Sequence, residues 1–216
     1  METGQIYHVF NASIANFTIF RSDSDFDRMM ALIQYYQVAR PARKFSEYIK
    51  SFSSKEYVPI TYLSRSDCTK LVEIISYCIM PMHPHMILYP LKENAISIFM
   101  SNVLNSYTRY FNIKYDRKGP LWEGRSKKVL VKTDEQLLHL TRYVHLNPVT
   151  AYLVDKPEDW TYSSYNEYVG CISTTKRICA YDNLLNIDPI LYKEFVYGGI
   201  ESQRALAKAK KATSTS

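Results

Sequence analysis

Several common sequence features are missing from this chain. The four cysteines, Cys68, Cys78, Cys171 and Cys179, show no Cys-x-x-Cys spacing, and the N-terminus lacks the charged and then apolar pattern of a secretory signal. These two absences favour a protein of the reducing cytoplasm. No apolar run approaches the length needed to cross a bilayer, so we expect no membrane partner.

The composition that is present indicates one globular domain with an anionic partner. At 216 residues the chain can build a single domain with a core, and a hydrophobic share of 46% excludes general disorder. An aromatic share of 14%, led by 19 tyrosines, can supply both core and stacking surfaces. The formal net charge of +6 favours an anionic partner, with solubility as the alternative explanation.

The first half of the chain reads as strands and helices with a basic excursion between them. Residues 6–14 have the β-branched and aromatic content of a strand, and Ser22 with Asp25 forms a capping pair before a helix. Residues 40–57 hold five basic residues against two acidic ones with weak periodicity, so we expect a basic loop or excursion, which we place at 40–70. Val72 to Ile79 predicts a strand that turns at Pro81 into a second strand.

That second strand carries His83 and His85. Residues i and i+2 of a strand share one face, so both imidazoles should point the same way, with Pro84 pointing away. Two convergent neutral imidazoles make half of a metal site. The alternative is a buried strand with two histidines that are satisfied structurally.

A long amphipathic helix from Ile96 to Tyr110 precedes a strongly basic segment, Lys114 to Lys132, with seven basic residues against two acidic ones. Aromatic residues interleaved with these charges suit a groove that binds a nucleic-acid backbone and stacks bases, whereas a solvated basic loop is the alternative. The candidate DNA-binding residues are Arg117, Lys118, Trp122, Arg125, Lys127 and Lys128.

The next predicted helix carries a second group of candidate site residues. It opens at a capping box of Thr133 and Gln136, and Pro148 should end or kink it. Tyr143 and Asn147 lie four residues apart and so share one face, where a phenol and an amide oxygen could approach one metal ion. His145 should point away from that face and have a structural role.

Five motifs, in this order, closely resemble the single-tyrosine HUH transposases of bacteria, in the REP-associated tyrosine transposase branch of the IS200-like superfamily. They are His83-Pro84-His85, residues 105–112, residues 119–125, residues 142–148 and residues 160–165. The resemblance implies an α+β fold with a central antiparallel sheet backed by helices, similar to ferredoxin or RNA-recognition-motif domains. It also implies single-stranded DNA as substrate, often beside a hairpin, and action at the bacterial nucleoid.

The resemblance further implies roles for individual residues. His83, His85 and Asn147 would bind a divalent metal ion, magnesium or manganese, and Tyr143 would be the nucleophile of DNA cleavage and strand transfer. The family pattern usually places Asn before the first histidine and a hydrophobic residue between the two, whereas this chain has Met82 and Pro84. Pro84 removes a backbone donor from an inner strand, which predicts a bulge or a strand edge.

Three functions therefore remain open at the level of sequence. The chain could be a cleaving transposase, a hairpin-DNA-binding relative that no longer cuts, or an unrelated metal-dependent hydrolase in which Tyr143 is a core aromatic. Both a monomer and a homodimer are compatible with the sequence. We expect a catalytic domain over 1–170, a packed extension over 171–201 and a disordered tail over 202–216; within the domain, residues 159–165 should cover the core.

Overall fold

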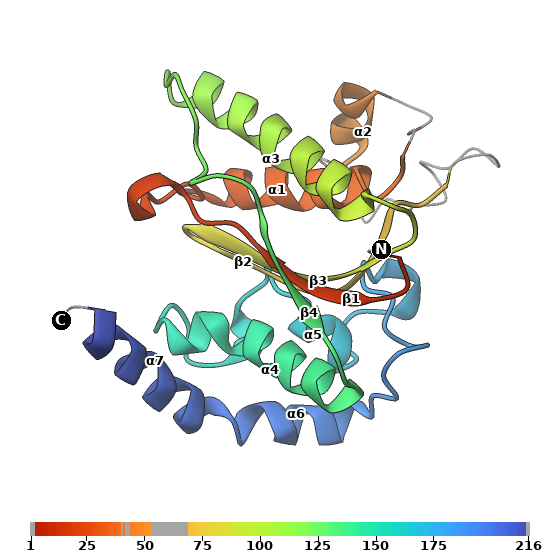
Figure 1. Cartoon of the computed structure of the whole chain (residues 1–216), viewed down its shortest axis with the longest axis vertical. Coiled ribbons are helices and arrows are strands. Elements are labelled where there is room, and N and C mark those ends of the chain that lie inside the picture. The colour runs from red at the N-terminus through yellow and green to blue at the C-terminus, as the bar shows by residue number, and fades with distance from the viewer. Residues whose placement is uncertain (1–2, 40, 42–43, 53–68, 215–216) are drawn as a thin grey trace.

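A four-stranded antiparallel sheet lies at the centre of the molecule, with helices on both of its faces (Figure 1). The computed structural model describes residues 3–39, 41, 44–52 and 69–214. The strand order across the sheet is β2-β3-β1-β4. The strands are β1 (Ile6–Phe10), β2 (Val72–Met80), β3 (His83–Pro90) and β4 (Lys127–Val131). The predicted α+β fold is therefore confirmed.

The helices form one layer on each side of the sheet (Figure 1). One layer contains α1 (Asp23–Tyr35), α2 (Phe45–Phe52) and α3 (Ala95–Lys114). The other contains α4 (Asp134–Thr150), α5 (Tyr165–Tyr168), α6 (Pro189–Tyr197) and α7 (Ile200–Ser214). Among the described residues, no helix is long and apolar enough to span a bilayer.

The two faces of the sheet differ in chemistry because side chains alternate along each strand. Val9 and Met86 are paired across β1 and β3 and are fully buried, as expected for the apolar face packed against α1 and α3. His8 and His85 occupy the alternate positions and therefore face the α4 layer. The sheet thus buries an apolar face on one side and presents imidazoles on the other.

The predicted hairpin is confirmed, and Pro84 sits in it without breaking the ladder. β2 pairs with β3 through Cys78 opposite His85 and Ile79 opposite Pro84. The pairing of β1 with β3 begins only at His85, so at Pro84 the strand β3 is locally an edge where a missing N–H costs little. The bulge lies elsewhere, in β2 between Ile74 and Ser76.

A buried carboxylate joins α1 to α3. Asp25 is fully buried, and its Oδ2 accepts hydrogen bonds from the backbone N–H groups of Arg21 and Ser22 at 2.9 and 3.1 Å, which confirms the predicted capping pair. Lys114 donates to Oδ1 at 2.6 Å and Tyr115 donates to Oδ2 at 2.7 Å. One acidic side chain therefore caps the beginning of α1 and binds the C-terminal end of α3.

Helix α4 runs past Pro148 to Thr150, so the proline does not end the helix. A proline at this position removes the hydrogen bond that its N–H would give to the carbonyl of Val144. The side chain of Asn147 supplies a substitute donor, with Nδ2 at 3.4 Å from that oxygen. The helix end is also contacted by Arg204 of α7, which donates to the carbonyl of Val149 at 3.3 Å.

One expectation from the sequence is wrong in the described residues. The tail from residue 202 is helical as part of α7 through Ser214, because its alanines and lysines favour helix and because Gln203 donates to the carbonyl of Tyr143 at 3.1 Å. The basic excursion contains the helix α2 rather than loop alone. Within that excursion, residues 40, 42–43 and 53–68 lie outside the described residues.

Candidate active site

The two histidines of β3 point to the same face, as the sequence predicts. The ring centroids of His83 and His85 are 4.8 Å apart and the ring planes are perpendicular, at 90°. His85 is 6% exposed, while His83 is half-buried and more accessible. His85 therefore lies in the protein core, and His83 lies nearer the surface.

Tyr143 lies on α4, in the helix layer that packs on the face of the sheet carrying this histidine pair. The ring of Tyr143 lies edge-on to the ring of His85, with 5.8 Å between centroids and 83° between planes. Because α4 packs on this face of the sheet, a residue far along the chain is brought to the histidines. Tyr143 of one predicted half of the site therefore lies beside His85 of the other half.

Asn147 lies one helical turn after Tyr143, and its amide orientation is fixed by its partners. Its side-chain Nδ2 donates to the carbonyl of Tyr143 at 3.0 Å and to the carbonyl of Val144 at 3.4 Å. Both partners are acceptors, so the nitrogen must face them and the oxygen Oδ1 must face away. That oxygen is the atom that could bind a metal ion.

The structure adds His8, which the sequence did not single out. His8 is buried in β1, and its Nε2 lies 3.1 Å from Nδ1 of His85. Its ring also meets the ring of Tyr143 edge-on, with a centroid distance of 6.0 Å. The sequence predicts that His8 lies on a strand. It does not predict that this strand pairs with β3, which is what brings His8 to His85.

Burial keeps the site imidazoles neutral. Burial lowers the pKa of His8 to about 4 and also lowers the pKa of His83. The pKa of His85 is well below its usual value, first through burial and then through the nearby His83 and His8. A metal-binding histidine must be neutral, so these three rings have the required protonation state.

The phenol of Tyr143 is not activated by the protein alone. Burial raises the pKa of Tyr143, and the nearby thiol of Cys78 raises it further. An ordinary phenol has a pKa of about 10, so Tyr143 is protonated at neutral pH. Deprotonation of this residue needs an additional positive charge close to the phenol oxygen.

The metal-binding set of His83, His85 and Asn147 stays a prediction from the sequence. Among the described residues, no three His, Cys, Asp or Glu side chains cluster in an arrangement that could hold a metal ion. The predicted set has only two side chains of those types, His83 and His85, with the amide oxygen of Asn147 as the third donor. Imidazole and amide oxygen are compatible with magnesium, manganese or zinc, and an incomplete protein set leaves room for substrate.

His145 anchors α4 from its other side, as predicted for a structural histidine. Its Nδ1 lies 2.7 Å from the hydroxyl of Tyr192 on α6, and its Nε2 lies 2.8 Å from Oγ of Ser164. The predicted return segment is confirmed at the same place, because Ser164 donates its N–H to Tyr77 of β2 at 3.0 Å. This network holds the helix that carries Tyr143 against the sheet.

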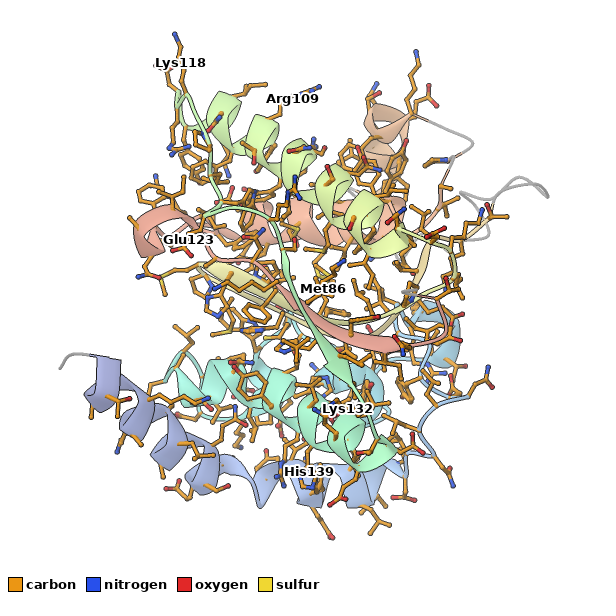
Figure 2. All side chains as sticks on the ribbon, viewed as in Figure 1. Met86, Arg109, Lys118, Glu123, Lys132 and His139 are labelled. Carbon is orange, nitrogen blue, oxygen red and sulfur yellow. The ribbon has the colours of Figure 1, made fainter. Side chains whose placement is uncertain are left out.

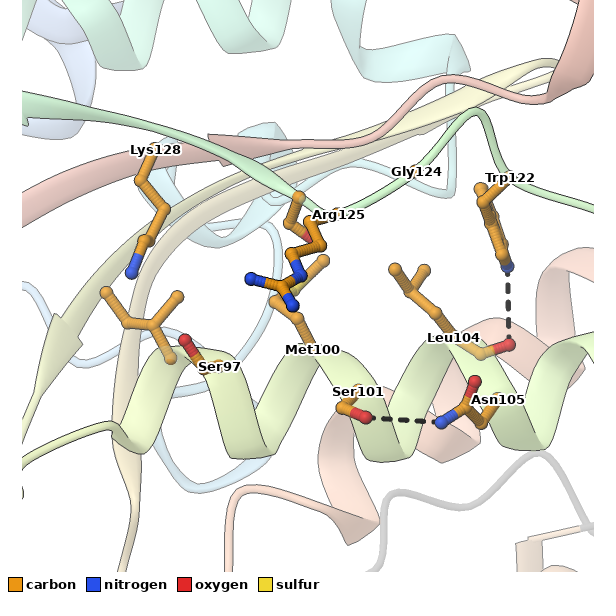
Figure 3. Close-up of a pocket in the computed structure, with 11 residues that line it drawn as sticks. Ser97, Met100, Ser101, Leu104, Asn105, Trp122, Gly124, Arg125 and Lys128 are labelled. Carbon is orange, nitrogen blue, oxygen red and sulfur yellow. Dashed lines mark hydrogen bonds between the residues drawn. The ribbon is translucent and has the colours of Figure 1, made fainter.

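A groove lies on the opposite face of the sheet, between α3 and the segment leading into β4 (Figure 3). Its volume is about 680 Å³, and none of its lining residues is acidic. Helix α3 itself contains no acidic residue. The polar and aromatic lining residues are Ser97, Ser101, Asn105, Trp122, Arg125, Ser126 and Lys128.

The six candidate DNA-binding residues do not share one surface. Trp122, Arg125 and Lys128 line the groove. Lys127 pairs with Phe10, so its side chain lies on the same face as the histidines. Lys118 extends from the tip of the loop after α3 (Figure 2). Arg117 stabilises that loop by donating to the carbonyl of Pro120 at 2.7 Å.

The role expected for Trp122 is restricted by its contacts. Its Nε1 donates to Oγ1 of Thr108 at 3.0 Å and to the carbonyl of Leu104 at 3.3 Å, and its ring packs near Tyr107. The indole is therefore fixed against α3 as a wall of the groove. Its N–H is already engaged, so only its exposed ring surface could contact a base.

Comparisons with known proteins agree with the resemblance found in the sequence. No protein-family model matches the chain. A stretch of 107 residues is 26% identical to a Haemophilus influenzae protein described as "Putative REP-associated tyrosine transposase". This match covers 45% of the present chain and 61% of that relative, so the chain spans less than two thirds of the relative's length.

A solved structure described as a REP-associated tyrosine transposase bound to a REP hairpin has the same fold. The TM-score is 0.51 at 15% sequence identity, and the match covers 86% of this chain and 94% of that chain. An identity this low establishes the fold alone. In sequence and in fold, the chain is similar to REP-associated tyrosine transposases, which confirms the resemblance predicted from its motifs.

Proposed function

We propose that this chain, which is similar to REP-associated tyrosine transposases, cleaves and rejoins single-stranded DNA beside a hairpin through a covalent bond to Tyr143. The observation that carries the proposal is the meeting of Tyr143 with the His83–His85 pair, with the ring of Tyr143 5.8 Å from that of His85. An aromatic residue that served only to fill the core would not need imidazole rings as neighbours. A phenol beside the neutral imidazole of His85, with Asn147 one helical turn away, suits phosphoryl transfer.

In the proposed reaction, Oη of Tyr143 attacks the phosphorus of a DNA phosphodiester. A new Oη–P bond forms while the P–O3′ bond breaks, the phenol loses its proton, and the departing 3′ oxygen gains one. The products are a 5′-phosphotyrosine and a free 3′ hydroxyl. Because the new ester is similar in energy to the bond broken, a 3′ hydroxyl can reverse the step without ATP.

The residues around Tyr143 have separate tasks in this reaction. His83, His85 and Asn147 would hold a divalent ion, magnesium or manganese by the family resemblance. When bound, such an ion supplies positive charge that neutralises the phosphate and favours the ionised phenol. Asn147 also fixes its own oxygen by donating to the carbonyl of Tyr143 at 3.0 Å.

The groove on the other face of the sheet is the proposed binding surface for the DNA backbone. It combines Arg125 and Lys128 with small polar side chains of α3 and has no acidic lining residue. Cationic and hydroxyl groups of this kind bind phosphates. The neighbouring solved structure is described as bound to a REP hairpin, and a hairpin is the ligand that we propose for this groove.

Covalent capture of DNA tests the proposal. The chain would be incubated with hairpin oligonucleotides that carry a single-stranded flank and a 3′-end label, with Mn²⁺ or with EDTA, and run on a denaturing gel. We expect label on the protein with Mn²⁺ and none with EDTA. His85→Ala and Asn147→Ala should abolish the adduct, while His139→Ala, an exposed histidine on α4, should retain it. An adduct that survives EDTA or His85→Ala would contradict the proposal.

A further inference from the structure

His8 contacts His85 through its ring nitrogen, deep inside the site. The Nε2 of His8 lies 3.1 Å from Nδ1 of His85, and the rings stack with centroids 5.2 Å apart and planes 22° apart. The two side chains are only 9% and 6% exposed. The proposed chemistry gives His8 no task, yet a buried polar side chain is placed here against a proposed metal ligand.

The direction of this hydrogen bond determines what His85 can do. A neutral imidazole carries one proton, so one nitrogen donates and the other accepts. If His85 offers Nε2 to a metal ion, its proton must sit on Nδ1, and His85 then donates to Nε2 of His8. The reverse arrangement would put the proton of His85 on Nε2 and remove the lone pair that a metal needs.

We propose that His8 is a positioning residue that accepts the Nδ1–H of His85 and so holds that ring in the tautomer and plane required for metal binding. This inference rests on the proposed function. Metal-binding histidines commonly donate their second nitrogen to a neighbouring acceptor, which fixes the ring and raises its basicity. Here the acceptor is a second imidazole rather than a carboxylate or a carbonyl.

The place of His8 in the sheet suits such a task. Strand β1 lies between β3 and β4, and its pairing with both holds the backbone of His8 in a defined position. The same ring lies edge-on to Tyr143, with planes 79° apart. One buried side chain therefore touches both the proposed ligand His85 and the proposed nucleophile.

The tautomer can be measured directly in the metal-free wild type. With ¹⁵N-labelled histidine, we expect nuclear magnetic resonance to show the proton of His85 on Nδ1 and a scalar coupling across the hydrogen bond to Nε2 of His8. A proton on Nε2 of His85 would overturn the inference. This measurement requires neither metal nor activity, so it remains decisive if the proposed function fails.

Metal affinity gives the second test, with Mn²⁺ as the probe in calorimetry. His8→Phe fills the same space without an acceptor and should weaken Mn²⁺ binding about 10–100-fold. His8→Gln, whose Oε1 can accept the bond, should recover most of the affinity. His139→Phe makes the same chemical change at an exposed position and should leave the affinity for Mn²⁺ unchanged.

The outcomes separate the two proposals. If wild type binds Mn²⁺ and His8→Phe binds equally well while folded by thermal unfolding, His8 has no positioning role and the inference is wrong. If wild type does not bind Mn²⁺, the metal in the proposed function is wrong, and the tautomer measurement still decides the role of His8.

Discussion

The ring of Tyr143 meets the ring of His85 edge-on across the interface between α4 and the sheet, with 5.8 Å between centroids. This relationship makes the site depend on how firmly α4 is held. The histidine network behind α4 and the contacts of α7 both hold it in place. Changes far from Tyr143 can therefore affect its position, and controls for stability are needed in each experiment below.

The first prediction concerns Asp25, which is fully buried. Burial alone raises the pKa of Asp25, but hydrogen bonds from Lys114 and Tyr115 lower it below the ordinary 3.8. A lowered pKa means that the stabilisation is present above pH 3.8 and is lost as pH falls through the folded-state pKa. Asp25→Asn removes the charge that Lys114 and Tyr115 bind, so we expect it to reduce the free energy of unfolding at neutral pH by about 2–3 kcal/mol. The loss stays below that of a fully buried ion pair because Lys114 is partly exposed.

Urea unfolding at neutral pH and at pH values below the ordinary pKa of Asp25 measures this effect. The difference between wild type and Asp25→Asn should be largest at neutral pH and shrink in acid. A difference that is the same at every pH would show that the charge of Asp25 does not stabilise the link between α1 and α3.

The second prediction concerns Arg125 in the groove. If Arg125 contacts a phosphate of single-stranded DNA, Arg125→Ala should reduce the slope of log affinity against log salt by about 0.7. Lys118 lies outside the groove, so Lys118→Ala should leave the slope unchanged. Fluorescence anisotropy across a salt series measures both slopes. Equal slopes for wild type and Arg125→Ala would remove the groove from the DNA-binding surface.

The third prediction concerns Pro84, where this chain departs from the family pattern. Pro84 is buried on the face away from His83 and His85, and the pairing of β1 with β3 begins only at the next residue. Pro84→Val should therefore change the free energy of unfolding by no more than ~1 kcal/mol and should leave Mn²⁺ binding intact. His85→Ala should abolish that binding without unfolding the protein.

Calorimetry with Mn²⁺ and thermal unfolding compare these variants. A wild type that binds no Mn²⁺ but gains binding with Met82→Asn and Pro84→Val together would identify the present chain as a DNA-binding relative that no longer cuts. That result would contradict the proposed cleavage while leaving the groove as a binding surface.

The sequence predicted the strands β1, β2 and β3, the helices α1, α3 and α4, and the shared face of His83 and His85, because strand alternation and helical spacing are local properties. It did not predict β4, whose short basic sequence becomes a strand only by pairing with β1. It could not predict His8, since its contact with His85 depends on the register between β1 and β3. For the same reason, the sequence could not predict that the basic segment 114–132 is divided between two surfaces. Lys127 and Lys128 are adjacent in sequence but lie on opposite faces of the sheet. The alanines and lysines of the tail favour helix, but the contact that holds its helix against α4 is tertiary and cannot be predicted from the sequence.

The identity of the nucleophile tests the central claim most directly. After reaction with a hairpin oligonucleotide and Mn²⁺, the protein would be digested with protease and nuclease and its peptides analysed by mass spectrometry. We expect a nucleotide 5′-phosphate on Tyr143 alone, and none in Tyr143→Phe, which should remain folded because the ring is retained. A nucleotide on any other residue, or an adduct that persists in Tyr143→Phe, would contradict the account.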